Sequence, residues 1–188
     1  MKVNQIASVS SGINNRRNPQ GSVYYLGASD FSDARTLNPL LKPSLMASPK
    51  LEKHYLNTSD VLVLAKGHHG FTAHTVAGDF QPAVASSVFL VLRKIATTVL
   101  PEYLVWYINL KSTQEELKGY GRGSALPAIN RTILGDLEIN IPDIEMQKNI
   151  VNLDKLKKNE SILVKQLDSL KTTQLELLLK TKIQNNEQ

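Results

Sequence analysis

The chain contains no cysteine and no long apolar run. The absence of cysteine excludes disulfides, thiol nucleophiles and thiolate metal sites, and it fits a reducing compartment. No stretch of eighteen apolar residues is available for a transmembrane helix, and the N-terminal MKVNQIASVSSG lacks the apolar segment of a signal peptide. We therefore expect a cytoplasmic protein that does not enter a membrane.

Glycine and proline are also absent from residue 143 to the C-terminus, so nothing in the sequence breaks a helix there. Leucines recur in this part at the a and d spacing of a heptad repeat, which predicts a long helix that packs against a partner helix. Asp143 is the expected N-cap, directly after Pro142. The apolar seam comprises Leu153, Leu156, Leu163, Leu167, Leu170 and Leu177.

This helix is expected to reach beyond its own domain. Roughly 38 residues make a rod about 57 Å long, more than one small domain can cover. Polar residues interrupt the seam at Glu160, Gln174 and Thr181, and such residues restrict register and partner choice. The seam therefore predicts a homodimer joined by a coiled coil. The alternative is a helix packed along its own domain.

Composition and charge favour a globular domain with a polyanionic partner. The 188 residues are 41% hydrophobic and 21% charged, typical of one core-forming domain plus the helix. The net charge is +5 and the sequence pI is about 9.3, which favours a partner such as DNA. Residues 1–142 carry 14 basic and 10 acidic residues, whereas residues 143–188 carry 8 and 7. The globular part, 1–142, is therefore the expected polyanion binder.

The pattern along residues 1–142 predicts an α+β fold with a mainly antiparallel sheet plus helices. Runs of β-branched and apolar residues predict the strands, and the second run is expected to pair antiparallel with the third. Residues 101–110 have helical spacing with Pro101 in the first turn. Polar, glycine-containing stretches predict loops at 10–21 and 119–124. The predicted strands are 23–26, 61–65, 71–76, 87–92 and 137–141.

No motif for catalysis or for a cofactor is present. The glycine-rich stretch 119–124 lacks the Gly-Lys-Ser/Thr of a phosphate-binding loop, and Asn18-Pro19 is followed by Gln20 rather than by the Pro-aromatic pair of an adenine methyltransferase. His68 and His69 are adjacent and have no carboxylate at metal-ligand spacing. Asp136 and Glu138 have the residue types of a nuclease but no paired lysine. We expect no enzyme, no cofactor and no metal, although a triad assembled in space stays open.

Three polar loops carry the side chains suited to DNA. Arginine can read guanine and asparagine can read adenine, while lysine, serine and backbone N–H groups suit phosphates. The alternative for each loop is ordinary solvated turn chemistry. The candidate DNA-binding residues are Asn14, Asn15, Arg16 and Arg17 in the first loop, Lys66, His68 and His69 in the second, and Arg122 and Ser124 in the third.

The order of several short motifs is more specific than any one of them. The motifs are 104–110, Gly121-x-Gly123-Ser124, 129–134, Leu137-x-Ile139-x-Ile141-Pro142, Gln147, Ile150-Val151, Asp60-Val61-Leu62 with Lys66-Gly67, and Ser11-Gly12. Together with the leucine helix they resemble one repeat of the specificity subunit of type I restriction-modification enzymes. Two positions depart from that pattern, because Ser59 stands where glycine is usual and Met146 where glutamate is usual.

The resemblance implies a DNA target recognition domain at 1–142 and a spacer and dimerisation helix at 143–188. Family members normally hold two such repeats whose helices pack antiparallel, so this chain resembles a half-subunit. Two copies would rebuild the full ruler and read an interrupted palindrome in double-stranded DNA. The resemblance also implies that catalysis lies in partner subunits, namely a methyltransferase (modification) subunit and a restriction subunit that translocates and cuts.

Two other functions compete with this hypothesis. A DNA-modifying enzyme would need the cofactor motifs that the sequence lacks. A coiled-coil structural protein would dimerise without binding DNA, and a salt-dependent DNA-binding measurement separates it from the specificity subunit.

Overall fold

The computed structural model describes residues 1–32, 36–66, 70–76, 78–120 and 127–185. The chain divides into two units, Met1–Lys148 and Asn149–Gln188, just beyond the boundary expected at residue 142. The elements are α1 (Val3–Ile6), β1 (Ser8–Ser11), β2 (Tyr24–Leu26), η1 (Ala28–Asp30), α2 (Pro49–Glu52), β3 (Val61–Leu64), β4 (Ala73–Thr75), β5 (Ala83–Ala85), β6 (Phe89–Arg93), α3 (Pro101–Ile108), α4 (Lys111–Tyr120), α5 (Arg131–Asp136) and α6 (Ile144–Asn185).

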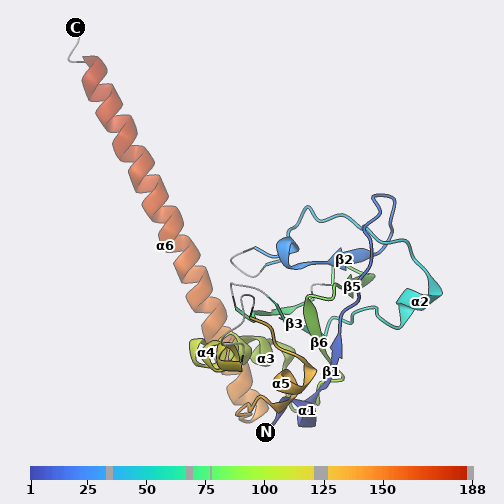
Figure 1. The fold of residues 1–188 in the computed structure, drawn as a ribbon. Helices are drawn as coiled ribbons and strands as arrows, with labels where there is room; N and C mark the ends of the chain where they lie inside the picture. The colour runs from blue at the N-terminus through green and yellow to red at the C-terminus, as the bar shows by residue number, and fades with distance from the viewer. Residues whose placement is uncertain (33–35, 67–69, 77, 121–126, 186–188) are drawn as a thin grey trace. The chain divides into compact units, whose positions relative to one another are not determined.

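Two sheets form the centre of the first unit (Figure 1). The larger has the strand order β1-β6-β3-β4, with every neighbouring pair antiparallel, as the sequence predicts. In the smaller sheet, β2 pairs parallel with β5. All four residues of β3 are buried, because this strand lies inside the sheet and has side chains packed on both faces. A fully buried Val or Leu contributes about 1.5–3 kcal/mol to stability, so β3 is a main source of core energy.

The outer edge of β4 is covered by two side-chain amides instead of a strand. The Asn109 amide accepts from Ala73 N–H at 3.0 Å and donates to Ala73 O at 2.8 Å. The Gln114 amide pairs in the same way with Phe71, at 2.8 and 3.0 Å. Each amide therefore imitates the donor and acceptor of a neighbouring strand, which satisfies backbone groups that an open edge would leave exposed.

Several sequence-based predictions are wrong. The stretch 10–21 is not entirely loop, because Ser10 and Ser11 belong to β1 and pair with β6. The strand predicted at 87–92 begins only at Phe89, and the preceding Ala83–Ala85 is a separate strand in the other sheet. Only the partner strands, which are distant in sequence, distinguish these two apolar runs.

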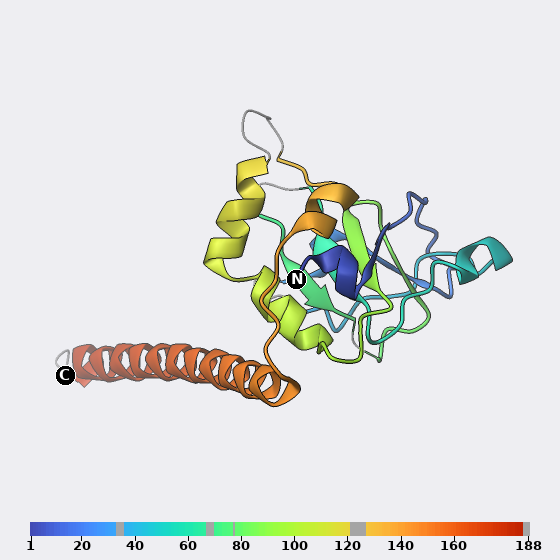
Figure 2. The ribbon, with the colours of Figure 1, turned by 90° about the horizontal axis from the view of Figure 1, so that it is seen from below.

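The C-terminal part of the first unit departs further from the prediction. Residues 137–141 form no strand, and Glu138 makes only an isolated bridge to Lys2. The alternating pattern that predicted a strand is present, because Leu137 and Ile139 are buried. Figure 2 shows this stretch beside the N-terminal segment, where Val3 N–H donates to Leu137 O at 3.0 Å. Helix α4 was not expected, and it includes Gly119, which the sequence places in a loop.

At the Ser11-Gly12 motif the backbone passes very close to residues 85 and 86. A Cβ atom on Gly12 would lie 2.1 Å from Ser86 O and 2.6 Å from Ala85 O. Gly12 N–H donates to Phe89 O at 2.9 Å, and Ile13 N–H donates to Ala85 O at 3.0 Å. Glycine is required here because any side chain would push β1 away from the β5–β6 turn.

Gln147 ties the start of α6 into the first unit. Its side chain is fully buried. The amide oxygen accepts from Leu100 N–H at 2.9 Å, and the amide nitrogen donates to Thr98 O at 2.9 Å and to Pro142 O at 2.8 Å. One side chain thereby satisfies three backbone groups around the N-termini of α3 and α6, where regular helical bonds are missing.

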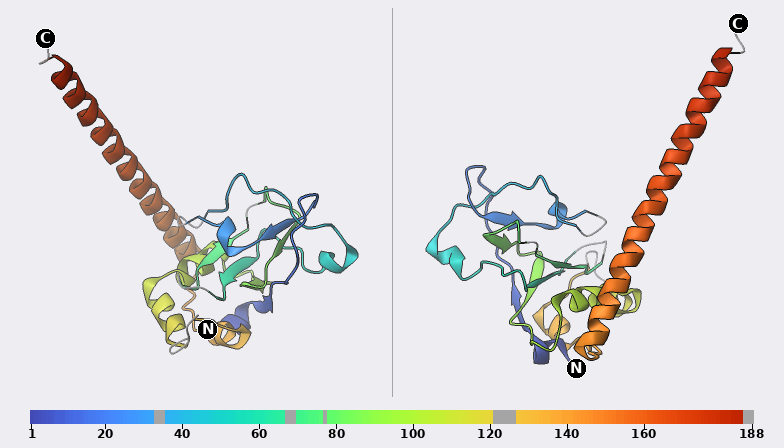
Figure 3. Two further views of the ribbon diagram at one scale, coloured as in Figure 1. Left: turned by 45° about the horizontal axis from the view of Figure 1, so that its top comes forward. Right: turned by 180° about the vertical axis from the view of Figure 1, so that it is seen from behind.

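Helix α6 is one continuous helix of 42 residues (Figure 3), about 63 Å long at 1.5 Å per residue. Asp143 is its N-cap, as predicted, because its carboxylate accepts from Met146 N–H at 2.8 Å. The six leucines of the predicted seam are 51% to 68% exposed. Among the described residues, no helix is long and apolar enough to span a membrane.

Candidate nucleic-acid interface

The first polar loop follows β1 and is held by Tyr25. Asn15 N–H donates to the Tyr25 hydroxyl oxygen at 3.2 Å, and that hydroxyl donates to Ile13 O at 2.9 Å. Because Tyr25 belongs to β2 and is itself buried, the loop has a fixed base on the smaller sheet. Side chains at its tip are therefore presented from a rigid support.

The two adjacent arginines of this loop have different surroundings. The Arg17 guanidinium donates to Asp30 Oδ2 at 2.6 Å and to Tyr25 O at 3.2 Å, and it lies over the Tyr25 ring. Its charge is balanced by Asp30, so it mainly positions the loop. Arg16 is exposed, and no partner of its guanidinium is recorded in the part of the chain that the structure describes. Arg16 is therefore available to a ligand.

A cavity of about 480 Å³ lies beside this loop. The loop supplies the polar residues 15–18 together with Pro19, and Leu45, Met46 and Leu51 supply apolar surface. Asn14 is exposed next to it, while the Asn15 side-chain oxygen accepts from Arg16 N–H at 2.8 Å and is thus engaged within the loop. Within the described ranges of the chain, no partner is recorded for the side chains of Arg16 and Asn14, which makes them the two candidate readers of this loop.

The second and third loops approach one another at their described ends. Lys66 is exposed and forms a bridge with Ala128, and Ile129 N–H donates to Ala65 O at 2.9 Å. The first loop instead adjoins residues 45–51. The other candidate residues, His68, His69, Arg122 and Ser124, lie outside the described residues.

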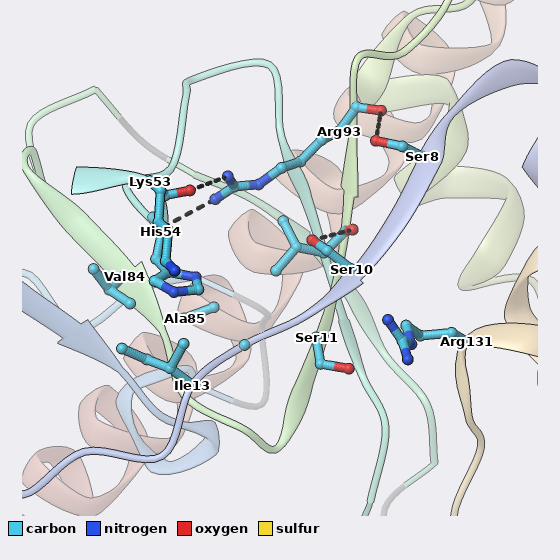
Figure 4. A pocket seen from close by; sticks show the side chains of 12 residues that line it. Ser8, Ser10, Ser11, Ile13, Lys53, His54, Val84, Ala85, Arg93 and Arg131 are labelled. Carbon is cyan, nitrogen blue, oxygen red and sulfur yellow. Dashed lines mark hydrogen bonds between the residues drawn. The ribbon is translucent and has the colours of Figure 1, made fainter. Parts of the chain in front are cut away.

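A second hollow, of about 440 Å³, lies against β1 and was not found from the sequence (Figure 4). Four basic residues line it, and none of its described lining residues is acidic. Lys53 and His54 follow α2, Arg93 ends β6 and Arg131 begins α5, so more than 70 residues separate the first from the last. Only folding brings these side chains to one place. The basic residues are Lys53, His54, Arg93 and Arg131.

The Arg93 guanidinium is engaged in contacts within the chain. Its guanidinium donates to Lys53 O at 3.2 Å and to His54 O and Tyr55 O at 3.0 Å each. Its Nε lies 3.3 Å from Asp60 Oδ2, an ion pair that is not aligned as a hydrogen bond. Burial raises the pKa of the Asp60 carboxyl, although Asn57 N–H and the Arg93 charge oppose that shift. The Asp60 motif thus holds the segment before β3 in place.

His54 contributes little charge to the hollow. Burial lowers the pKa of its imidazole, and the neighbouring Lys53 and Arg93 charges lower it further. This shift favours the neutral form of the imidazole. Lys53 and Arg131 remain, and no partner of either side-chain charge is recorded among the described residues. Within the described residues no cluster of three or more His, Cys, Asp or Glu suits a metal ion.

Comparison with known protein families now gives a direct match. The model of the type I restriction modification DNA specificity domain matches residues 5–172. The chain belongs to this family, so the resemblance predicted from the sequence is confirmed. Comparison with curated protein sequences gives no match.

Solved structures show the same fold. The HsdS subunit from Thermoanaerobacter tengcongensis has a TM-score of 0.63 and 17% identity over 87% of this chain. A chain from work on complex assembly and conformational transition of the type I R-M system has a TM-score of 0.59 and 18% identity, also over 87%. The S subunit from M. genitalium has a TM-score of 0.54 and 15% identity over 85%. The chain spans 38–39% of the length of these structures, and the predicted α+β fold class is confirmed.

Proposed function

We propose that this chain is a sequence-specific DNA-binding subunit of a type I restriction-modification system. The observation that carries the proposal is the family match over residues 5–172. The first loop, which is held by Tyr25 and exposes Arg16, also supports the proposal. In this proposal the chain catalyses no reaction and directs methylation and restriction by a modification subunit and a restriction subunit.

The proposed subunit acts as a homodimer. All six leucines of the seam are at least half exposed, which is unusual for large apolar side chains at regular spacing. A second α6 that packs antiparallel would cover them and place two identical recognition units at opposite ends. The DNA target would then be an interrupted palindrome, with half-sites about one helical turn, roughly 34–36 Å, apart.

DNA binding by the chain tests the proposal directly. We expect the chain, alone or with its modification subunit, to bind duplex DNA, with affinity falling steeply between two salt concentrations, because phosphate contacts release counterions. The measurement is a gel shift, accompanied by co-purification with candidate partner subunits and mass determination. If the chain forms a complex with the partner subunits but this complex does not bind DNA, the result would favour a structural coiled-coil protein instead.

The two arginines of the first loop should respond differently to replacement. Arg16→Ala should weaken binding to the mapped target by about 1–3 kcal/mol if it contacts a base, with unchanged thermal stability. Arg17→Ala should weaken binding and also lower stability, because it removes the partner of Asp30 and frees the loop. Binding is measured by anisotropy and stability by thermal unfolding. Equal effects of both changes on both quantities would contradict this division of roles.

A further inference from the structure

Strand β1 forms an open edge of the larger sheet. Its neighbour on one side is β6, and no strand pairs with its other side among the described residues. Gly12 N–H donates to Phe89 O in the same ladder, so Ser10 and Ser8 belong to the hydrogen-bonded pairs. In an antiparallel pair the alternate residues, Val9 and Ser11, then direct their backbone N–H and C=O groups outward. The open edge therefore offers backbone donors and acceptors.

The hollow against β1 continues along this edge. A neighbouring hollow of about 390 Å³ shares Ser8 and Arg131 with it and is also lined by Val9. Because the two hollows share these residues of β1 and α5, we describe them together as the β1 groove. Its polar lining from the first hollow consists of Ser8, Ser10, Ser11, Lys53, His54 and Arg131.

The charged side chains that line the β1 groove have a positive balance. Figure 4 shows the Arg131 guanidinium and the Ser11 hydroxyl directed toward one another on one side of β1. The described lining residues include one carboxylate, Asp136, and its charge is paired with Lys2 at 3.0 Å. Neither Phe, Tyr nor Trp is among them, and the charged side chains without a recorded partner are Lys53 and Arg131, which suit phosphate oxygens.

We propose that the β1 groove binds backbone phosphates of the duplex DNA, with Lys53 and Arg131 as the charged contacts and Ser11 as a hydroxyl donor. Hydroxyls, backbone N–H groups, Lys and Arg are the groups that proteins use for phosphate oxygens. Because phosphates are the same at every base pair, a contact made to them alone is independent of sequence. The inference rests on the proposed function and adds a positioning surface, separate in the chain from the three loops, that fixes the register of the recognition unit on DNA.

The test uses the full chain, with its modification subunit bound if that complex is the DNA-binding form. Lys53→Gln and Arg131→Gln remove one charge each and leave the backbone contacts of Lys53 O to Arg93 in place. Lys50→Gln is the matched control, because Lys50 is an exposed lysine of α2 that does not line the groove. Anisotropy at several salt concentrations gives the Kd for the target duplex and for an unrelated duplex.

Each groove variant should weaken both duplexes by a similar factor, roughly 3- to 10-fold, and should reduce the slope of log Kd against log salt by about 1. The double variant should reduce the slope by about 2, while Lys50→Gln changes neither quantity. Arg131→Lys should restore most of the slope, since a phosphate contact needs the charge more than the guanidinium shape.

Three outcomes overturn the inference. If the parent chain binds DNA and the double variant keeps its slope and Kd, the groove does not contact phosphates, and the proposed function stands. If the variants lose only the target duplex, the groove reads sequence. If they lose the modification subunit but keep the salt slope, the groove binds an acidic protein surface. Failure of the parent chain to bind any duplex would instead remove the proposed function together with this inference.

Discussion

A chain that carries both Leu163→Lys and Leu170→Lys is expected to sediment as a monomer while its recognition unit stays folded. Both leucines occupy d positions of the seam and are 63% and 68% exposed in the single chain. In an antiparallel pair each would be buried against the partner helix, where a leucine contributes about 1.5–3 kcal/mol and a lysine charge opposes association. Four such changes per dimer should raise the dimer Kd at least about a thousandfold.

The matched control is the pair Ser161→Lys and Ser169→Lys, which adds the same charge to α6 outside the a and d positions. Equilibrium sedimentation should show this control as a dimer, like the parent chain. Thermal unfolding of the leucine variant should keep the transition of the first unit, which has its own buried core. A parent chain that is monomeric even with its modification partner bound, or a mapped DNA target without symmetry, would disprove the paired helices.

Replacing Gln147 should cause a large loss of stability. Gln147→Ala leaves Leu100 N–H, Thr98 O and Pro142 O without their partner in a buried place and also opens a cavity. Unsatisfied buried groups cost about 1–3 kcal/mol each, so the free energy of unfolding should fall by at least about 3 kcal/mol in total. For a unit of this size the midpoint of thermal unfolding should fall by roughly 10 °C.

Two further variants separate hydrogen bonding from packing at this position. Gln147→Met keeps most of the side-chain volume but has no amide. Its free energy of unfolding should therefore fall by most of the amount expected for Gln147→Ala. Met146→Ala alters the neighbouring residue, which is 50% exposed, and should stay within about 0.5 kcal/mol of the parent. If Gln147→Met were as stable as the parent, the three hydrogen bonds would contribute nothing net and Gln147 would act through packing alone.

Features set by local or periodic pattern could be predicted from the sequence. The apolar run of β3, Pro101 in the first turn of α3 and the Asp143 cap of α6 were all identified correctly. Each depends on neighbours within a few residues or on a repeat of fixed period. The family was found for the same reason, because its motifs occur in a fixed order along the chain.

Features set by contacts between distant segments could not be predicted. The parallel pairing of β2 with β5 joins strands that are almost sixty residues apart, and the two apolar runs around residues 83–92 look alike until their partners are known. The division of labour between Arg16 and Arg17 depends on Asp30 and Tyr25, which the first loop reaches only after folding.

The sequence by itself determined the long leucine helix, the central strand β3 and membership of the DNA specificity family. Only the tertiary structure decided that Gln147 is a buried connector and that Lys53 and Arg131 line the same hollow against β1. Helical periodicity and capping depend on residues that are close together in the sequence. A groove forms between elements that are distant in the sequence, and their positions depend on the packing of the whole core.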